Sequence, residues 1–317
     1  MKLAKEWKVA VIGAGTMGVF LAQYFASKKQ NTFLYNRTLE NLESAKNKVS
    51  MSLKTMDSLK ALDDDITPEK VLSHLSFTND LSEALDNADI VFECVSEDPI
   101  IKREVFASIS KYAPADAYLC SDTSALNIYD IVEIANPKRL LITHFFNPPN
   151  LMPLVEIVKG IETSHEVVNS VSAFLEDMGK KPIILEKFIP GFIFNRLLTA
   201  LEREALYIVE TGVASYKDVD NVITTTFGPR FLFEGIFQLL DYVGLDTEAL
   251  VVGDLLQELC NSTEPSSLLL KKVELSEYGI KTKKGFKDYA HIDVDELIQK
   301  RTANIIKTLR CGETLDI

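Results

Sequence analysis

A short apolar segment, three closely spaced glycines and a helix-forming stretch open this 317-residue chain, and together they constrain its fold more than any other feature. The segment KVAVI (8–12) predicts a strand, the glycines predict a tight turn, and the residues up to Lys29 predict a helix. A second predicted strand, TFLYN (32–36), ends about 20 residues after the turn. Such a turn leaves backbone N–H groups free at a helix N-terminus to bind a pyrophosphate. The residues that we expect to contact a dinucleotide are Gly13, Gly15, Thr16, Met17 and Gly18.

Short apolar strands then alternate with helical stretches, a pattern that predicts a mostly parallel, doubly wound sheet. The further strands are expected at residues 75–78, 90–94, 118–121, 140–144, 154–158 and 183–185. After Pro190 and Gly191 the pattern becomes helical only, with helices expected at residues 192–210, 215–225, 231–243, 246–261, 266–278 and 294–308. The expected fold class is therefore α/β, with an N-terminal Rossmann-type domain (1–187) and a C-terminal all-helical domain (188–317).

Composition argues against several classes of protein. The net charge of −12 disfavours a nucleic-acid binder, which needs basic surfaces to displace counterions. No apolar run approaches the roughly 20 residues of a membrane span, and the N-terminal residues MKLAKEWK lack the features of a signal peptide, so we expect a cytoplasmic protein. The four cysteines are widely separated and form no C-x-x-C motif, which predicts neither a metal site nor a disulfide framework.

His144, one of only four histidines, ends the apolar segment RLLIT and precedes the residues FFNP. An alcohol gives up a hydride only as its proton leaves, so that reaction needs a base of near-neutral pKa, which histidine supplies. Glu156 follows twelve residues later, and a carboxylate beside the ring would fix its tautomer and stabilise the imidazolium. Both residues lie near the ends of predicted strands and can converge at one edge of the sheet. The alternative is a histidine buried for packing alone.

Two further polar side chains are suited to hold a substrate oxygen, because hydroxyl and amide groups bind both an alcohol and a carbonyl. Ser124 follows the predicted strand 118–121, and Asn195 lies on the first helix of the second domain. The alternative for each is an ordinary capping or surface role.

Seven motifs together resemble the L-3-hydroxyacyl-CoA dehydrogenase family over essentially the full chain. They are VIGAGTMG, ECVSEDPIIKREVF, SDTSALNI, HFFNPPNLMPLVEIV, PGFIFNRL, LLDYVGLD and GIKTKKGF. The resemblance implies an NAD(P)-binding domain, a helical domain that usually dimerises, and reversible oxidation of a (3S)-3-hydroxyacyl-CoA thioester to the 3-oxoacyl thioester.

Positions in these motifs imply individual roles. The matches to the family's base, its partner carboxylate and its two substrate-orienting groups are His144, Glu156, Ser124 and Asn195. Glu97 and Lys102 match contacts to the nicotinamide ribose. Ser52 falls near a position that touches the pantetheine, in a lysine- and glutamate-rich segment (39–70) that we interpret as a solvated helical arm.

Two departures from the family pattern affect specificity. Relatives specific for NAD place an acidic residue at the end of the second strand, where this chain has Asn36, followed by Arg37 and Thr38. This triplet is similar to that of NADP-dependent 6-phosphogluconate dehydrogenases, in which the arginine pairs with the 2′-phosphate. The residues therefore lean toward NADP, whereas the family resemblance favours NAD. The segment GPRFLFEGIFQ (228–238) replaces a shorter turn of the family, which leaves the choice of substrate open.

Two other functions stay open beside the acyl-CoA dehydrogenase. One is a dehydrogenase of a free 3-hydroxyacid, of the L-gulonate or L-carnitine type, because those sequences are similar at ECVSED and NPP. The other is a non-catalytic dinucleotide-binding protein similar to a lens crystallin, although the four matched active-site residues argue against it. The residues 192–210 and 231–243 are more apolar than one packed helix face requires, so we also expect a homodimer formed through the helical domain.

Overall fold

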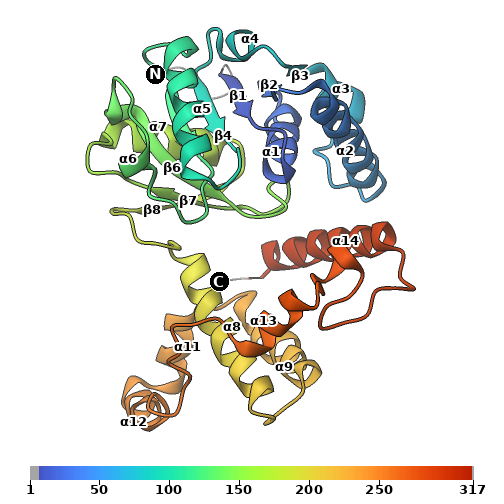
Figure 1. The fold of residues 1–317 in the computed structure, drawn as a ribbon, viewed down its shortest axis with the longest axis vertical. Helices are drawn as coiled ribbons and strands as arrows, with labels where there is room; N and C mark the ends of the chain where they lie inside the picture. The colour runs from blue at the N-terminus through green and yellow to red at the C-terminus, as the bar shows by residue number, and fades with distance from the viewer. Residues whose placement is uncertain (1–6, 316–317) are drawn as a thin grey trace. The chain divides into compact units, whose positions relative to one another are not determined.

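The computed structural model describes residues 7–315, and its N-terminal part is built on one eight-stranded sheet (Figure 1). Residues 1–6, part of the segment in which we expected no signal peptide, lie outside the described residues. In chain order the strands are β1 (Lys8–Ile12), β2 (Asn31–Tyr35), β3 (Leu75–Thr78), β4 (Ile90–Glu93), β5 (Tyr118–Ser121), β6 (Leu140–Phe145), β7 (Leu154–Val158) and β8 (Lys181–Leu185). Their order across the sheet is β3-β2-β1-β4-β5-β6-β7-β8, and every neighbouring pair is parallel except β6 and β7. The predicted Rossmann-type fold is confirmed.

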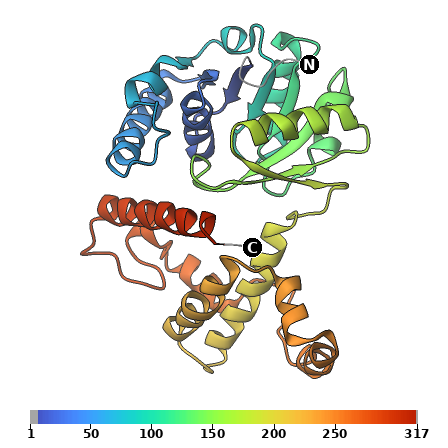
Figure 2. The ribbon, with the colours of Figure 1, turned by 180° about the vertical axis from the view of Figure 1, so that it is seen from behind.

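Helices cover both faces of this sheet, as Figures 1 and 2 show from opposite sides. One face packs against α1 (Thr16–Ser27), α2 (Leu39–Ser58), α3 (Pro68–Ser73) and α7 (His165–Asp177). The other face packs against α4 (Leu81–Leu85), α5 (Pro99–Tyr112) and α6 (Ile128–Ile131). Side chains of a strand alternate between faces, so in β1 Val9 and Val11 join the first core while Ala10 and Ile12 join the second. Burial on both sides explains why the strands are continuous apolar runs.

The segment 39–70 differs from the solvated arm that we expected. Its helix α2 ends at Ser58, and Ala45, Val49 and Leu53 are buried in the same core as α1. These residues recur every four positions, so they form an apolar stripe on one side of the helix while the charged residues occupy the other. The expectation of a solvated arm was wrong for this buried face.

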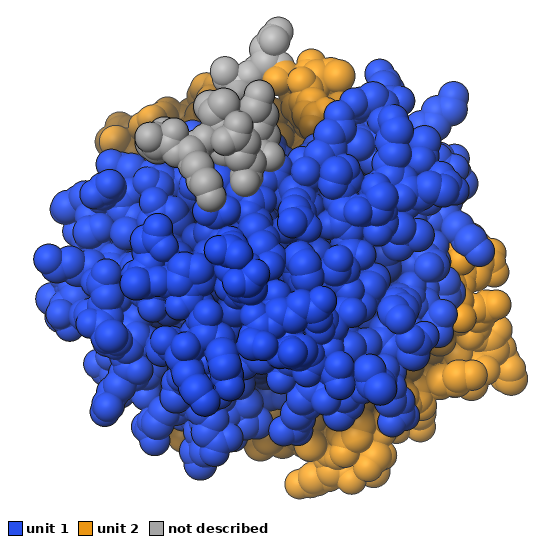
Figure 3. Space-filling model, turned by 90° about the horizontal axis from the view of Figure 1, so that it is seen from above, with its two compact units in different colours: residues 1–195 blue, residues 196–317 orange. Residues whose placement is uncertain are grey.

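The chain divides into two compact units, residues 1–195 and 196–317, which Figure 3 distinguishes by colour. The domain boundary that the sequence suggested near residue 187 stays a prediction. The described helices from the start of α8 onward are α8 (Phe194–Glu210), α9 (Tyr216–Val222), η3 (Ile223–Phe227), α10 (Gly228–Phe231), α11 (Ile236–Val243), α12 (Leu245–Leu255), α13 (Ser267–Glu274), η4 (Ile280–Thr282) and α14 (Val294–Glu313).

The second unit leaves most of its apolar side chains accessible. Among its described residues only Glu234 and Ile306 are buried, whereas Leu197 of α8 is 62% exposed and Phe237 of α11 is 79% exposed. A unit of this size normally buries a substantial core when it folds alone. Among the described residues of the whole chain, no helix is both long and apolar enough to cross a membrane.

Candidate active site

The glycine turn between β1 and α1 is shaped by two close backbone contacts. Gly13 has φ +117°, and a Cβ atom there would lie 2.6 Å from the carbonyl oxygen of Cys94. A Cβ atom on Gly18 would lie 1.9 Å from the carbonyl oxygen of Gly13. A Cβ atom on Gly15, in contrast, would meet no protein atom nearer than 3.9 Å. Close contacts within the protein therefore require the first and third glycines. The second, Gly15, faces open space, where a ligand could approach the backbone.

That open space lies at the N-terminus of α1. The first intrahelical hydrogen bond is donated by Val19 to Gly15, so the backbone N–H groups of Thr16, Met17 and Gly18 have no partner within the helix. Free N–H groups and the helix dipole favour a bound anion at this position. The turn thus fits the pyrophosphate of a nicotinamide dinucleotide.

The end of β2 carries the residues that we connected with cofactor choice. The Nδ2 atom of Asn36 donates a hydrogen bond to Oγ1 of Thr38 at 3.1 Å. Arg37 is exposed and forms no hydrogen bond or ion pair with any described residue. No carboxylate occupies the position of Asn36, and the guanidinium of Arg37 is available to an anionic group. The preference for NADP that these residues suggested stays a prediction.

His144 and Glu156 meet across two antiparallel strands. They are directly opposite residues of β6 and β7, and Nδ1 of His144 lies 2.8 Å from Oε2 of Glu156. Both side chains are buried. We had expected both residues near strand ends, but Glu156 lies in the middle of β7, which returns antiparallel to β6. Opposite residues of antiparallel strands point to the same face, and this places the carboxylate beside the ring.

The other oxygen of the same carboxylate is held by backbone groups. Oε1 of Glu156 accepts hydrogen bonds from the N–H groups of Ile193 at 2.8 Å and Phe194 at 3.0 Å. Burial opposes ionisation of Glu156, but the hydrogen bonds from His144 and from these two N–H groups outweigh it and lower the pKa of the carboxyl group. An ionised Glu156 accepts a hydrogen bond from Nδ1–H of His144, which leaves Nε2 as the unprotonated nitrogen of the neutral ring.

Lys102 is fully buried within a carboxylate cluster. Its Nζ atom lies 2.8 and 3.0 Å from the two carboxylate oxygens of Glu93 and 3.4 Å from Oε2 of Glu97. Burial alone would lower the pKa of Lys102, but the charge of Glu93 and its hydrogen bonds raise it. The ammonium group is thus engaged by the protein, and the ribose contact that the family resemblance assigns to Lys102 stays a prediction.

Glu97 binds the segment that directly follows β5. Its Oε1 atom accepts hydrogen bonds from Oγ1 of Thr123 at 2.6 Å, the N–H of Ser124 at 2.9 Å and the N–H of Ala125 at 3.0 Å. The carbonyl oxygen of Ser124 in turn accepts a hydrogen bond from Nδ2 of Asn195 at 3.2 Å. The structure therefore brings Glu97, Ser124 and Asn195 together, and the hydroxyl of Ser124 lies on an exposed residue.

Three polar residues of this region were not among our candidates. Glu93 binds Lys102 and also accepts a hydrogen bond from Oγ of Ser121 at 2.6 Å. Asp122 accepts the N–H of Phe145 at 2.9 Å, which links the end of β5 to the strand that carries His144. The signal in the sequence was a carboxylate that ends an otherwise apolar strand, as Glu93 does in IVFE.

Ser52 lies on α2 and is half-buried. Its hydroxyl is 3.5 Å from Nδ2 of Asn150, a residue of the loop that joins β6 to β7. The structure thus places Ser52 beside the loop that follows His144, and its contact with a pantetheine stays a prediction.

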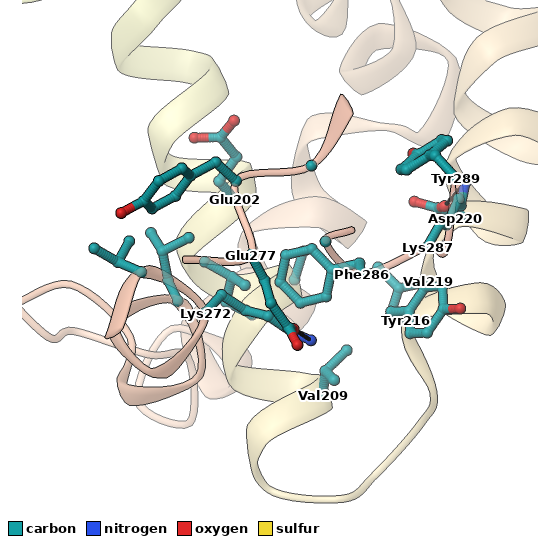
Figure 4. Close-up of a pocket in the computed structure, with 17 residues that line it drawn as sticks. Glu202, Val209, Tyr216, Val219, Asp220, Lys272, Glu277, Phe286, Lys287 and Tyr289 are labelled. Atoms are coloured by element: carbon teal, nitrogen blue, oxygen red, sulfur yellow. Dashed lines mark hydrogen bonds and ion pairs between the residues drawn. The ribbon is translucent and has the colours of Figure 1, made fainter. Parts of the chain in front are cut away.

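The second unit contains a cavity of about 650 Å³ that none of the predicted site residues lines (Figure 4). Four of its charged side chains form ion pairs: Glu277 lies 2.5 Å from Lys272, and Asp220 lies 2.9 Å from Lys287. Among the described residues of the chain, no group of three or more His, Cys, Asp or Glu side chains is arranged to hold a metal ion. The candidate active site therefore lies in the first unit, where the glycine turn, Glu97, Ser124 and His144 follow or end β1, β4, β5 and β6.

Comparison with known families matches both parts of the chain. Residues 8–188 match the NAD-binding domain of 3-hydroxyacyl-CoA dehydrogenase, and residues 191–289 match the C-terminal domain of the same family. Helix α14 lies beyond the second matched range.

Similar proteins include two kinds of dehydrogenase. The chain is 30% identical to 5-formyl-3-hydroxy-2-methylpyridine 4-carboxylate 5-dehydrogenase from Mesorhizobium japonicum, over 96% of this chain and 98% of that protein. It is 34% identical to mitochondrial hydroxyacyl-coenzyme A dehydrogenase from Sus scrofa, over 89% and 90% of the two chains. Among solved structures, an NAD⁺-dependent 5-dehydrogenase of the same pyridine carboxylic acid has a TM-score of 0.89 at 29% identity, covering 98% of this chain and all of that chain. The (S)-3-hydroxybutyryl-CoA dehydrogenase from Ralstonia eutropha has a TM-score of 0.72 at 26% identity, covering 90% and 99%.

Proposed function

This chain belongs to the 3-hydroxyacyl-CoA dehydrogenase family and is an NAD(P)-dependent dehydrogenase, and we propose that it reversibly oxidises a (3S)-3-hydroxyacyl-CoA to the 3-oxoacyl-CoA. The observation that carries this proposal is the buried pair of His144 and Glu156, at 2.8 Å, in the sheet whose first strand leads into the glycine turn. An imidazole held by a carboxylate is the arrangement that removal of a proton from an alcohol requires.

In this proposal Nε2 of His144 takes the proton of the substrate hydroxyl. A nicotinamide dinucleotide held at the glycine turn would supply the hydride acceptor. Glu156 holds Nδ1 and stabilises the charge that the ring gains. In the reverse direction His144 returns the proton to the new alcohol oxygen. The pair thus serves as acid and base in turn.

Ser124 and Asn195 are proposed to orient the reacting oxygen. Ser124 is an exposed residue, and the hydrogen bond from Nδ2 of Asn195 to the carbonyl oxygen of Ser124 holds the two residues together. A hydroxyl and an amide can each donate to a carbonyl oxygen, and the hydroxyl can also accept from an alcohol. Glu97 supports this arrangement through the N–H of Ser124.

A dehydrogenase of a free carboxylic acid is the second candidate. It is favoured by the pyridine-carboxylate enzyme, whose structure matches 98% of this chain with a TM-score of 0.89, against 0.72 for the 3-hydroxybutyryl-CoA enzyme. Helix α14 lies beyond the residues that match the family's C-terminal domain. The structure of the pyridine-carboxylate enzyme, which covers 98% of this chain, extends over this helix as well. The sequence motifs GIKTKKGF and LLDYVGLD favour the acyl-CoA substrate.

A direct comparison of substrates separates these candidates. Oxidation of NADH and of NADPH would be followed with acetoacetyl-CoA and with free acetoacetate at equal concentrations. We expect turnover of the thioester, because the proposed substrate carries CoA. Turnover of the free acid alone would exclude the acyl-CoA proposal and favour the second candidate.

A further inference from the structure

Two phenylalanine rings contact the imidazole of His144, and a third packs against one of them. The ring centroid of Phe146 lies 4.7 Å from that of His144, and the centroid of Phe192 lies 5.4 Å from it. Phe194 meets Phe146 edge to face, with centroids 4.6 Å apart and an interplanar angle of 66°. The proposed base is therefore packed against aromatic rings, and Phe146 connects it to the ring of Phe194.

The three rings differ in accessibility. Phe192 is fully buried and Phe146 is 8% exposed, so both contribute mainly to packing. Phe194 is 41% exposed, which leaves a substantial part of its ring free to touch a ligand. A single exposed aromatic residue has no special meaning by itself. This one is in contact with a ring that contacts the proposed base.

The backbone of Phe194 is fixed by the proposed active site on both sides. Its N–H donates to Oε1 of Glu156 at 3.0 Å. The next residue, Asn195, donates from its side chain to the carbonyl oxygen of Ser124 at 3.2 Å. The backbone that carries the Phe194 ring is thus held next to Glu156 and Ser124 by hydrogen bonds, and the ring itself packs against Phe146.

We propose that Phe194 is a specificity-determining residue whose exposed ring binds a flat, unsaturated or aromatic group attached to the reacting carbon of the substrate. The inference rests on the proposed function, because it assumes that the reaction takes place at His144. Two aromatic rings attract each other beyond the burial of their area, whereas a saturated chain gains only the burial. The ring should therefore raise the preference for an aryl over an alkyl substituent by about 2- to 10-fold.

Matched pairs of ketones test this preference. The probes are benzoylacetyl-CoA against acetoacetyl-CoA, and benzoylacetate against acetoacetate, so that the aryl-to-alkyl ratio is taken within each pair and does not depend on CoA. The ratio would be measured as kcat/KM and, on the enzyme–NADH complex, as Kd. The variants are Phe194→Leu, which keeps apolar volume without the ring, and Phe194→Tyr, which keeps the ring. Phe188→Leu serves as a control, because Phe188 contacts Phe192, with ring centroids 5.9 Å apart, and among the described residues it makes no ring contact with Phe146 or Phe194.

We expect Phe194→Leu to lower the aryl-to-alkyl ratio by about 2- to 10-fold, and Phe194→Tyr to leave the ratio near its wild-type value. An unchanged ratio in Phe194→Leu, or an equal fall in Phe188→Leu, would overturn the inference even if overall activity dropped. A wild-type protein that turns over none of the probes would instead overturn the proposed function. In that case the ratio of Kd values for the NADH complex still decides whether Phe194 recognises a flat group, and failure of all four probes to bind would overturn both.

Discussion

The imidazole of His144 lies 2.8 Å from the carboxylate of Glu156, although the two residues are twelve positions apart in the chain. The contact depends on the reversal between β6 and β7, which sets these residues directly opposite each other. The same carboxylate accepts the N–H groups at the beginning of α8, so one side chain fixes both the base and the start of the helix that carries Asn195. Substitutions of His144 or Glu156 should therefore lower kcat and leave cofactor binding largely intact.

Replacing His144 by glutamine should lower kcat by about 10²- to 10⁴-fold, because a positioned base usually contributes that much. Binding of NADH should survive, since the glycine turn is untouched. Turnover would be measured with the better of the two proposed substrates, and NADH affinity by fluorescence titration. His165→Gln is a matched control, because His165 is exposed on α7 and should keep normal turnover. Near-normal kcat in His144→Gln would remove His144 from the mechanism.

Glu156 should act through His144 and not on the substrate. The prediction is that Glu156→Gln and His144→Gln each lower kcat strongly, while the double variant stays within about tenfold of His144→Gln alone. The reason is that a carboxylate that orients a ring has nothing left to orient once the ring is gone. Losses that multiply in the double variant would show that the two residues act independently.

Local patterns in the sequence were sufficient to predict the strands and the glycine turn. Runs such as KVAVI are apolar because both faces of the sheet are covered, and the turn requires glycine at Gly13, where φ is positive. The buried face of α2 could not be distinguished from a solvated helix by charge content alone. Its apolar residues form a narrow stripe, and only the packing against α1 shows that the stripe is buried.

The polar cluster around Lys102 was only half predictable. The family motif identified Glu97 and Lys102, but the partner that holds the lysine is Glu93, at 2.8 Å. This pairing depends on the rotation of α5 relative to β4, which no local pattern encodes. The pairing of His144 with Glu156 could not be predicted for a similar reason. The sequence predicts the strands β6 and β7 but not that they run antiparallel to each other.

Lys180 leads to a prediction about stability and pH. It is buried, and its Nζ atom donates hydrogen bonds to the carbonyl oxygens of Pro149 at 2.5 Å and Met152 at 2.8 Å. Burial, with a smaller effect from Lys28, lowers the pKa of Lys180 to about 7, well below the ordinary lysine value of 10.5 that the unfolded chain should show. Between these two pH values the unfolded state binds a proton that the folded state lacks, so the free energy of unfolding should rise with pH.

The measurement compares the wild-type protein with Lys180→Met in urea at about pH 6 and about pH 9. Subtracting the two proteins removes the contributions of other titrating groups. The wild-type protein should gain stability relative to Lys180→Met at the higher pH. A difference that falls or stays constant with rising pH would show that Lys180 remains charged in the folded state.

The exposed apolar side chains of the helical unit predict a homodimer. Leu197 and Phe237 are 62% and 79% exposed on helices with strongly apolar faces, and such surfaces are normally covered. Sedimentation at micromolar concentration should give twice the mass of the chain, and Phe237→Asp should weaken the association. Ile161→Asp, at a fully exposed apolar residue of the first unit, should not. A wild-type monomer would contradict the prediction.

The choice between NADH and NADPH is the last prediction. Asn36 offers no carboxylate to repel a 2′-phosphate, and Arg37 is exposed with no partner among the described residues. Charge-assisted hydrogen bonds from a guanidinium to phosphate are among the stronger ones in proteins, so NADPH should be accepted at least as well as NADH. Substituting Asn36→Asp together with Arg37→Gln should shift the ratio of kcat/KM toward NADH, chiefly because the new carboxylate repels the phosphate.

The family comparison argues in the opposite direction, because residues 8–188 match an NAD-binding domain and the pyridine-carboxylate relative is NAD⁺-dependent. The two single variants separate the contributions: Arg37→Gln removes attraction for the phosphate, and Asn36→Asp adds repulsion. If Arg37 reads the phosphate, Arg37→Gln alone should raise KM for NADPH and leave KM for NADH nearly unchanged. A wild-type preference for NADH of tenfold or more, about 1.4 kcal/mol, would instead mean that Arg37 points to solvent and that the family's cofactor is retained.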